Sequence, residues 1–193
     1  MTEAPRRPAH DADARGRLST KQGPDRRSGL LLGLGLGGFV DGIVLHQVLQ
    51  WHHMVSDVGA YPVDTVAGLE VNTLADGLFH VATWVLVLAG SLGTVSAWRQ
   101  GRLAPSWAFH VGLLLVGWGV FDVVEGLVDH EILGVHHVRD DLGGPLSWDL
   151  GFLAFGVLLV LGGWALHRYG ASRPPSIGST QAARQAGGSD LSA

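Results

Sequence analysis

The sequence predicts an all-α fold, a four-transmembrane-helix bundle built from two tandem helix-pair repeats, and three observations support it. Hydrophobic residues make up 47% of the 193 residues, and charged residues only 16%. The apolar residues gather in four runs, each of roughly the 20 residues that a membrane-spanning helix needs. A His-rich motif occurs twice, at the end of the first run and at the end of the third. These features are typical of an integral membrane protein.

Composition also excludes several kinds of function. The formal net charge is −4, so no basic surface indicates binding of nucleic acid. The chain has no cysteine, which excludes disulfides, thiolate metal sites and iron–sulfur clusters. The predicted partner is the lipid bilayer, because the composition is typical of a membrane protein.

Four spans are expected, with polar tails outside them. The spans run from about Gly29 to Trp51, from about Leu74 to Trp98, from Trp107 to about Val128 and from Leu146 to Leu166. We predict a transmembrane domain over residues 29–170. The polar segments 1–28 and 171–193 are expected to be disordered cytoplasmic tails.

Lysine and arginine set the expected orientation. Of 13 such residues, seven lie in the N-terminal tail, two between the second and third spans, and three after the fourth span. Only Arg139 lies in a connection on the other side. Because cytoplasmic connections carry the excess of Lys and Arg, both termini of this multi-pass plasma-membrane protein are expected in the cytoplasm. The connections Val55–Thr73 and Ile132–Ser147 then face outside.

The two His-rich motifs match one another at an offset of 84 residues. DGIVLHQVLQWHH (41–53) aligns with EGLVDHEILGVHH (125–137), with six of 13 positions identical, three of them histidines. The partner spans each place an aspartate near the predicted outer start, at Asp76 and Asp149. We interpret the match as two copies of a helix-pair unit, related by an axis along the membrane normal. Seven histidines and several carboxylates then meet at the outer end of the bundle.

Carboxylates and histidines inside predicted spans indicate a metal site, because an unpaired charge there costs about 2.5 kcal/mol or more. Imidazole and carboxylate without sulfur suit one or two transition-metal ions, of iron, copper or zinc. Candidate metal ligands are His46, His52, His53, His80, His130, His136, His137, Glu125 and Asp76. Other residues are expected to hold the ligands in place or to pack the helices together, namely Asp41, Gly42, Asp122, Gly126, Asp129 and Asp149.

Regular α-helix geometry limits which of these residues share one ion. His46 and His53 lie about 10 Å apart along such a helix, so one ion takes both only if the helix ends between them. Gly134, at the equivalent place in the second copy, favours such a break. Asp41 and His46 point about 140° away from each other, so Asp41 is expected to support the ligands or pack the helices and not to share an ion with His46. The glycines that follow Asp41 and its counterpart permit close helix approach or a local bulge.

The stretches GFVDGIVLHQVLQWHHM, ADGLFH and VEGLVDHEILGVHHV together resemble an uncharacterised bacterial family of small four-span, His-rich membrane proteins that is defined by a domain of unknown function. The match covers about Gly29 to Arg168 and is specific at the His motifs. It implies the four-span fold and no established activity. A loose association of the family with genes for copper assembly of respiratory oxidases implies respiratory or assembly membrane proteins as partners.

The predicted function is a His/carboxylate transition-metal site at the extracytoplasmic end of the bundle, used for metal-centred redox chemistry or metal handling near the respiratory chain. A membrane cytochrome with a haem held by His46 and His130 is one alternative. A proton or ion conduit along the acidic residues of the third span is a second, and the apolar inner halves of the spans count against it. A membrane subunit that uses acid–His pairs only to hold helices together is the third.

Overall fold

Four long helices make up the described part of the chain, residues 23–172 of the computed structural model. All four are long and apolar enough to cross a membrane. The predicted all-α, four-span class is confirmed, whereas most of the predicted tails lies outside the described residues. The helices and their extensions are α1 (Arg27–Asp41), the π-helix η1 (Gly42–Val48), α2 (Val66–Arg99), α3 (Trp107–Glu125), the π-helix η2 (Gly126–Ile132), the short 3₁₀ turn η3 (Asp140–Leu142) and α4 (Leu146–Ser172).

The second helix begins earlier than predicted, at Val66 instead of Leu74. Thr65 caps it, because its Oγ1 accepts a hydrogen bond from the backbone N–H of Gly68 at 3.1 Å. Two extra turns therefore precede Asp76, which lies inside the helix and not near its start. The fourth helix begins at the predicted Leu146.

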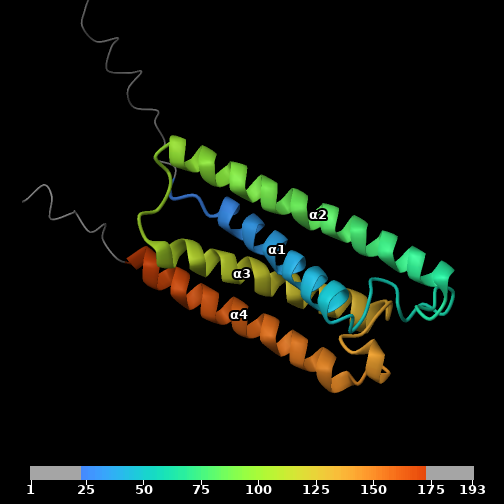
Figure 1. The fold of residues 1–193 in the computed structure, drawn as a ribbon. Helices are drawn as coiled ribbons and strands as arrows, with labels where there is room; N and C mark the ends of the chain where they lie inside the picture. The colour runs from blue at the N-terminus through green and yellow to red at the C-terminus, as the bar shows by residue number, and fades with distance from the viewer. Residues whose placement is uncertain (1–22, 173–193) are drawn as a thin grey trace, which may run out of the picture.

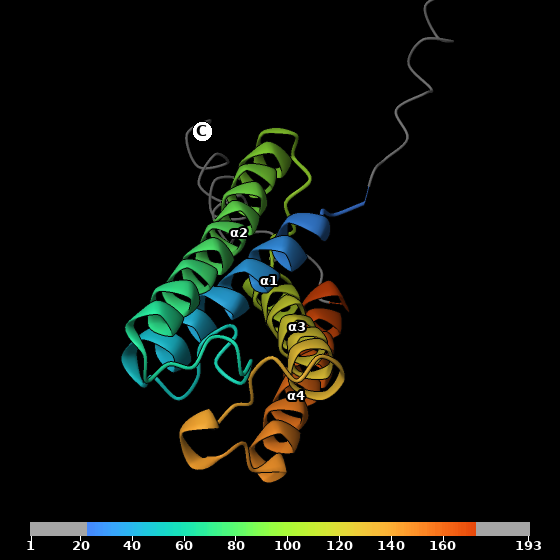
Figure 2. The ribbon, with the colours of Figure 1, turned by 90° about the vertical axis from the view of Figure 1, so that its right-hand side faces the viewer.

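The helices are arranged in a row in the order α2, α1, α3, α4 (Figure 1). α1 packs against both α2 and α3, and α3 packs against both α1 and α4. Within residues 23–172, α2 and α4 make no contact with each other. The connections that follow η1 and η2 come together at one end of the row, in both views (Figures 1 and 2). The two central helices therefore position whatever that end contains.

Glycines set the close approach of the helices. A Cβ atom added to Gly33 in α1 would lie 2.2 Å from the carbonyl oxygen of Leu114, and one added to Gly117 in α3 would lie 2.3 Å from that of Leu30. Small residues at such positions let two backbones meet, which is the usual way for helices to pack in a membrane. The α1–α3 contact positions η1 and η2 at the same end of the row (Figure 1).

Each central helix widens into a π-helix at a glycine, Gly42 in one and Gly126 in the other. The predicted local bulge is confirmed at both positions. Two residues after each π-helix the backbone is left-handed, at Gln50 with φ of 52° and at Gly134 with φ of 56°. The predicted break between His46 and His53 is thereby confirmed, and the chain turns back over the end of the row.

Candidate metal centre

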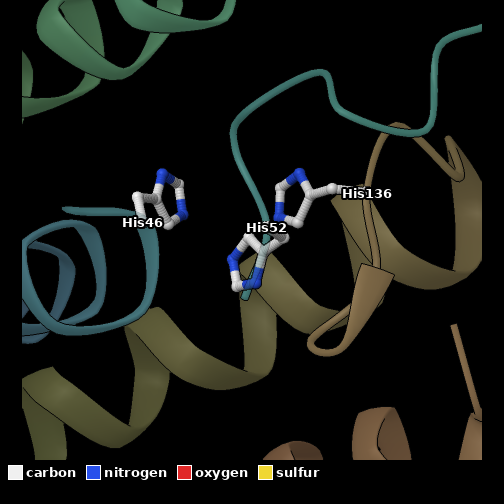
Figure 3. Close-up of side chains that lie close together, drawn as sticks. All are labelled: His46, His52 and His136. Carbon is white, nitrogen blue, oxygen red and sulfur yellow. The ribbon is translucent and has the colours of Figure 1, made fainter. Parts of the chain in front are cut away.

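Four buried imidazoles lie at the end of the row where the connections after η1 and η2 meet (Figure 1), and two of them come from each half of the chain. His46 and His130 lie on η1 and η2, whereas His52 and His136 lie on the connections that follow. Their side chains are at most 2% exposed. Neighbouring ring centroids within this group lie 4.5 to 6.0 Å apart. Figure 3 shows the rings of His46, His52 and His136 gathered between their three segments.

Backbone carbonyl groups orient two of these rings. His52 Nδ1 lies 3.1 Å from the carbonyl oxygen of Val138, and His136 Nδ1 lies 3.1 Å from that of Met54. A carbonyl oxygen only accepts hydrogen bonds, so each Nδ1 donates and carries the proton. The two bonds cross from one half of the chain to the other, at positions 84 residues apart. Each leaves the Nε2 atom as the nitrogen that can bind a metal.

The Nε2 atoms of His46 and His52 have no hydrogen bond of regular geometry within the described part of the chain. One nitrogen each of His46, His52 and His136 lie within 4.8 Å of one another, and so do ligand atoms of Glu125, His130 and His136. Burial, together with the neighbouring imidazoles of His136 and His46, lowers the pKa of His52 to about 2, so its ring is neutral. A neutral imidazole offers the lone pair that a metal ion needs.

Two acids lie against the same imidazoles. Asp41 Oδ2 is 3.3 Å from His46 Nε2, and Glu125 Oε1 is 3.0 Å from His130 Nε2. The expectation that Asp41 points away from His46 is wrong, because it assumed a regular α-helix. In a π-helix the hydrogen bonds join residues five apart, and side chains at that spacing come close together. The glycine after each acid begins the π-helix that makes this contact.

Several of these contacts set an acceptor against an acceptor. His136 already donates from Nδ1 to a carbonyl oxygen, yet its Nε2 lies 2.8 Å from Glu125 Oε1. His46 has a carboxylate at each nitrogen, Asp76 Oδ1 at 3.0 Å and Asp41 Oδ2 at 3.3 Å. A neutral imidazole carries a single N–H and cannot satisfy both sides. The arrangement therefore requires an additional proton or a metal cation among these atoms.

Two further aspartates hold the imidazoles from outside. Asp76 accepts hydrogen bonds from His46 Nδ1 at 3.0 Å and His53 Nδ1 at 2.6 Å, and also from the backbone N–H of Met54 at 2.9 Å. In the other half, Asp149 accepts from His137 Nδ1 and from the backbone N–H of Val138, at 2.8 and 2.9 Å. Asp149 Oδ1 also lies 3.4 Å from His130 Nδ1. His53 and His137, which these carboxylates also bind, are less buried than the four central histidines.

The remaining candidate residues lie around the centre. His80 donates from Nδ1 to the carbonyl oxygen of Asp76, at 2.7 Å, and its ring packs against Phe39 and Phe79. Asp122 is buried beside a neighbouring pocket, and Asp129 is half-buried on η2. Gly42 packs against Phe79 and His80, and Gly126 against Phe152 and Leu153.

The sequence reasoning missed two groups that join the connections. Ser56 Oγ and Asp140 Oδ2 are hydrogen-bonded to each other, at positions 84 residues apart. Each also caps a histidine backbone, since His53 N donates to Ser56 Oγ at 2.9 Å and His137 N donates to Asp140 Oδ1 at 2.8 Å. The carbonyl groups of Met54 and Val138 were missed as well, because a backbone acceptor leaves no mark in a sequence pattern.

Comparison with family models places the chain in a family of membrane proteins. The model of a family described as predicted membrane protein (DUF2243) matches residues 28–170. The chain belongs to this family. The family match covers all four helices, and the resemblance inferred from the His motifs is confirmed. No curated protein and no solved structure was found to match the sequence.

Proposed function

We propose that this member of the DUF2243 family is a membrane metalloprotein that holds one or two transition-metal ions for redox chemistry or metal handling. The ions are iron, copper or zinc, and the ligands come from the four central imidazoles and from two acids, Asp41 and Glu125. One observation carries the proposal: buried imidazoles and carboxylates face each other acceptor to acceptor, where a cation would satisfy them all.

The chemistry of the donor set supports a transition metal. Imidazole with carboxylate is typical of zinc, iron and copper(II) sites, whereas an all-oxygen set would favour calcium or magnesium. Hydrogen bonds from Nδ1 to carbonyl or carboxylate oxygens fix the ring orientation and raise the basicity of Nε2. His46, His52 and His136 each have such a bond.

The two groups of ligand atoms set the number of ions. The group of His46 and His52 and the group of Glu125 and His130 both include His136. A single imidazole nitrogen has one lone pair, so His136 serves one ion at a time. We therefore expect one tightly bound ion, with a second bound only when His136 is replaced as a ligand.

The packing of the rings favours a bare ion over a haem. A haem bound by two histidines lies between their rings, as a flat macrocycle. Here the space around His46 and His130 is filled by His52 and His136, with neighbouring centroids 4.5 to 6.0 Å apart. Four imidazoles packed this closely suit a single metal ion better than a haem.

The distribution of basic residues supports an extracytoplasmic position for the centre. Five of the arginines in the described residues lie toward one end of the row, and Arg139 lies toward the other, beside the imidazoles. The positive-inside rule then puts the centre on the outer side of a plasma membrane, where respiratory or assembly membrane proteins can exchange metal or electrons with it. A reporter fused after Ala171 should read cytoplasmic, and one inserted in the connection before Val66 should read extracytoplasmic. The opposite pair of readings would put the centre in the cytoplasm.

Metal analysis of four variants tests the proposal. Protein purified from metal-replete cells should contain about one transition-metal ion per chain. His46→Ala and His130→Ala should each remove most of it, and the double variant should remove little more, because the residues share one centre. His167→Ala is the matched control, because His167 is equally buried but lies at the other end of the row, against Phe109.

Other outcomes would each point elsewhere. Half occupancy in both single variants would indicate two independent sites and contradict the shared centre. Metal-free wild-type protein would refute the metalloprotein proposal and favour acid–His pairs as contacts between helices. A Soret absorption band would favour the haem alternative.

A further inference from the structure

An apolar pocket lies beside the metal centre, on one face of the row. Its volume is about 480 Å³, within the range of pockets that bind small molecules. α3 forms its floor, and α1 with η1 and α4 form its sides. Its walls are rich in aromatic side chains, namely Trp51, Trp118, Trp148, Phe152 and Phe155.

Two carboxylates line this otherwise apolar space. Asp41 is 6% exposed and Asp122 is 1% exposed. Neither oxygen of Asp41, and not Oδ2 of Asp122, has a hydrogen bond of regular geometry in the part of the chain that the structure describes. Leaving a buried acceptor without a donor is unfavourable. A molecule in the pocket that presents a donor to these oxygens would remove that cost.

The tryptophans of the pocket have no aromatic counterpart at the matching positions of the two copies. At the offset of 84 for the central helices and of 73 for the outer ones, the three tryptophans correspond to smaller residues, Val135, Leu34 and Ala75. Asp122 corresponds to Gly38. A pocket with three tryptophans and a second carboxylate is therefore a feature added to one side of a nearly repeated frame.

We propose that this pocket binds a membrane-soluble phenol of the hydroquinone type, with its ring between the aromatic walls and its hydroxyl group donating to Asp41 or Asp122. Flat rings pack well against tryptophan and phenylalanine, and an unpaired carboxyl oxygen accepts a hydrogen bond from a hydroxyl group. Val40, Val44 and Phe155 at the pocket are exposed on spanning helices, so the ligand enters from the bilayer. A lipid acyl chain would fit the walls but offer no donor to Oδ1 of Asp41 or Oδ2 of Asp122.

The outer rim of the pocket carries a cation. The guanidinium of Arg139 lies over the ring of Trp51 at 4.4 Å and over that of Trp148 at 5.0 Å. These contacts hold the two tryptophans at the rim, since cations are attracted to the faces of aromatic rings. Asp122 is not among the proposed metal ligands, so its oxygen can accept from the phenol whether or not a metal occupies the neighbouring centre.

Calorimetric titration of the protein in lipid nanodiscs tests the proposal. The probe is decyl-hydroquinone kept reduced without oxygen, and empty nanodiscs correct for partition into lipid. Its dimethyl ether has the same ring and tail but no donor. We expect the hydroquinone to bind about tenfold or more tightly than the ether, because the ether leaves the carboxylates unpaired. Equal binding of the two, or tighter binding of decanol, would overturn the proposal.

Two glycines of α4 supply matched variants. Both have open space where a side chain would stand, but Gly151 lines the pocket and Gly162 does not. Gly151→Leu should weaken hydroquinone binding by about tenfold, because it fills the pocket, and Gly162→Leu should not change it. Unchanged binding in Gly151→Leu would contradict the pocket as the site. Metal content is measured in the same samples, so metal-free protein that still binds the hydroquinone would refute the metal centre and leave this proposal intact.

Discussion

The two halves of the centre present the same imidazoles but different acids. Asp41 reaches only His46, at 3.3 Å, whereas Glu125 is one methylene longer and reaches His130 at 3.0 Å and His136 at 2.8 Å. Glu125 thus contacts both central imidazoles of the second motif. In the first motif, Nε2 of His52 has no hydrogen bond within the described part of the chain. The two matching motifs therefore form an unsymmetrical site, and we expect the first ion to bind where His46, His52 and His136 meet, because every ligand atom of that group is an imidazole nitrogen.

Removing the two acids in turn should give the largest difference between the halves. Glu125→Gln should weaken metal binding by about tenfold or more, since its oxygen contacts two imidazoles. Loss of a group that only orients a metal ligand already lowers metal affinity by about 10–100-fold. Asp41→Asn should cost less, because Asp41 contacts one imidazole at a longer distance. Titration against a competing chelator measures both affinities. Equal losses in the two variants would mean that the difference in reach has no role in binding.

The outer aspartates should give the next largest effect, of about tenfold. Asp76→Asn should cost more metal affinity than Asp149→Asn, because Asp76 holds its ring nitrogen at 3.0 Å while the matching contact of Asp149 is 3.4 Å. Asp64→Asn, at an exposed position in the connection before α2, serves as the control and should bind metal as the wild type does. The same chelator titration applies. A larger loss for Asp149→Asn would show that these distances do not rank the two supports.

The sequence predicted the four spans and the meeting of the His motifs, since both follow from long apolar runs and from one offset. It did not predict that Asp41 contacts His46, because the angle between them was taken from a regular α-helix and the helix becomes a π-helix at Gly42. It also left open which histidines are central. His52 and His136 lie inside because backbone carbonyl groups orient them, and no side-chain pattern records such a bond.

The close contact of the central helices should matter less for metal than for stability. Gly33→Ala brings a methyl group to 2.2 Å from a backbone carbonyl oxygen, so α1 and α3 must separate. We expect a loss of about 1–3 kcal/mol in stability. Gly42→Ala meets only the ends of the His80 and Phe79 rings, at 2.8 and 3.0 Å, and should cost less. Thermal unfolding in detergent, followed by tryptophan fluorescence, compares them. A greater loss for Gly42→Ala would mean that the π-helix, and not the α1–α3 contact, limits stability.

The smallest effect is expected where the two halves differ outside the centre. His80 corresponds to Leu153 at the offset of 73, so His80→Leu gives both halves the same residue. The imidazole of His80 is bonded to the carbonyl oxygen of Asp76 in its own helix and packs between Phe39 and Phe79, away from the four central rings. Leucine fills similar space, and the carbonyl keeps its helical hydrogen bond. Metal content and affinity should therefore stay within about twofold of the wild type, which elemental analysis and chelator titration measure together. A loss as large as that of His46→Ala would make His80 a ligand, and the centre would then extend farther on the side of the first half than on that of the second.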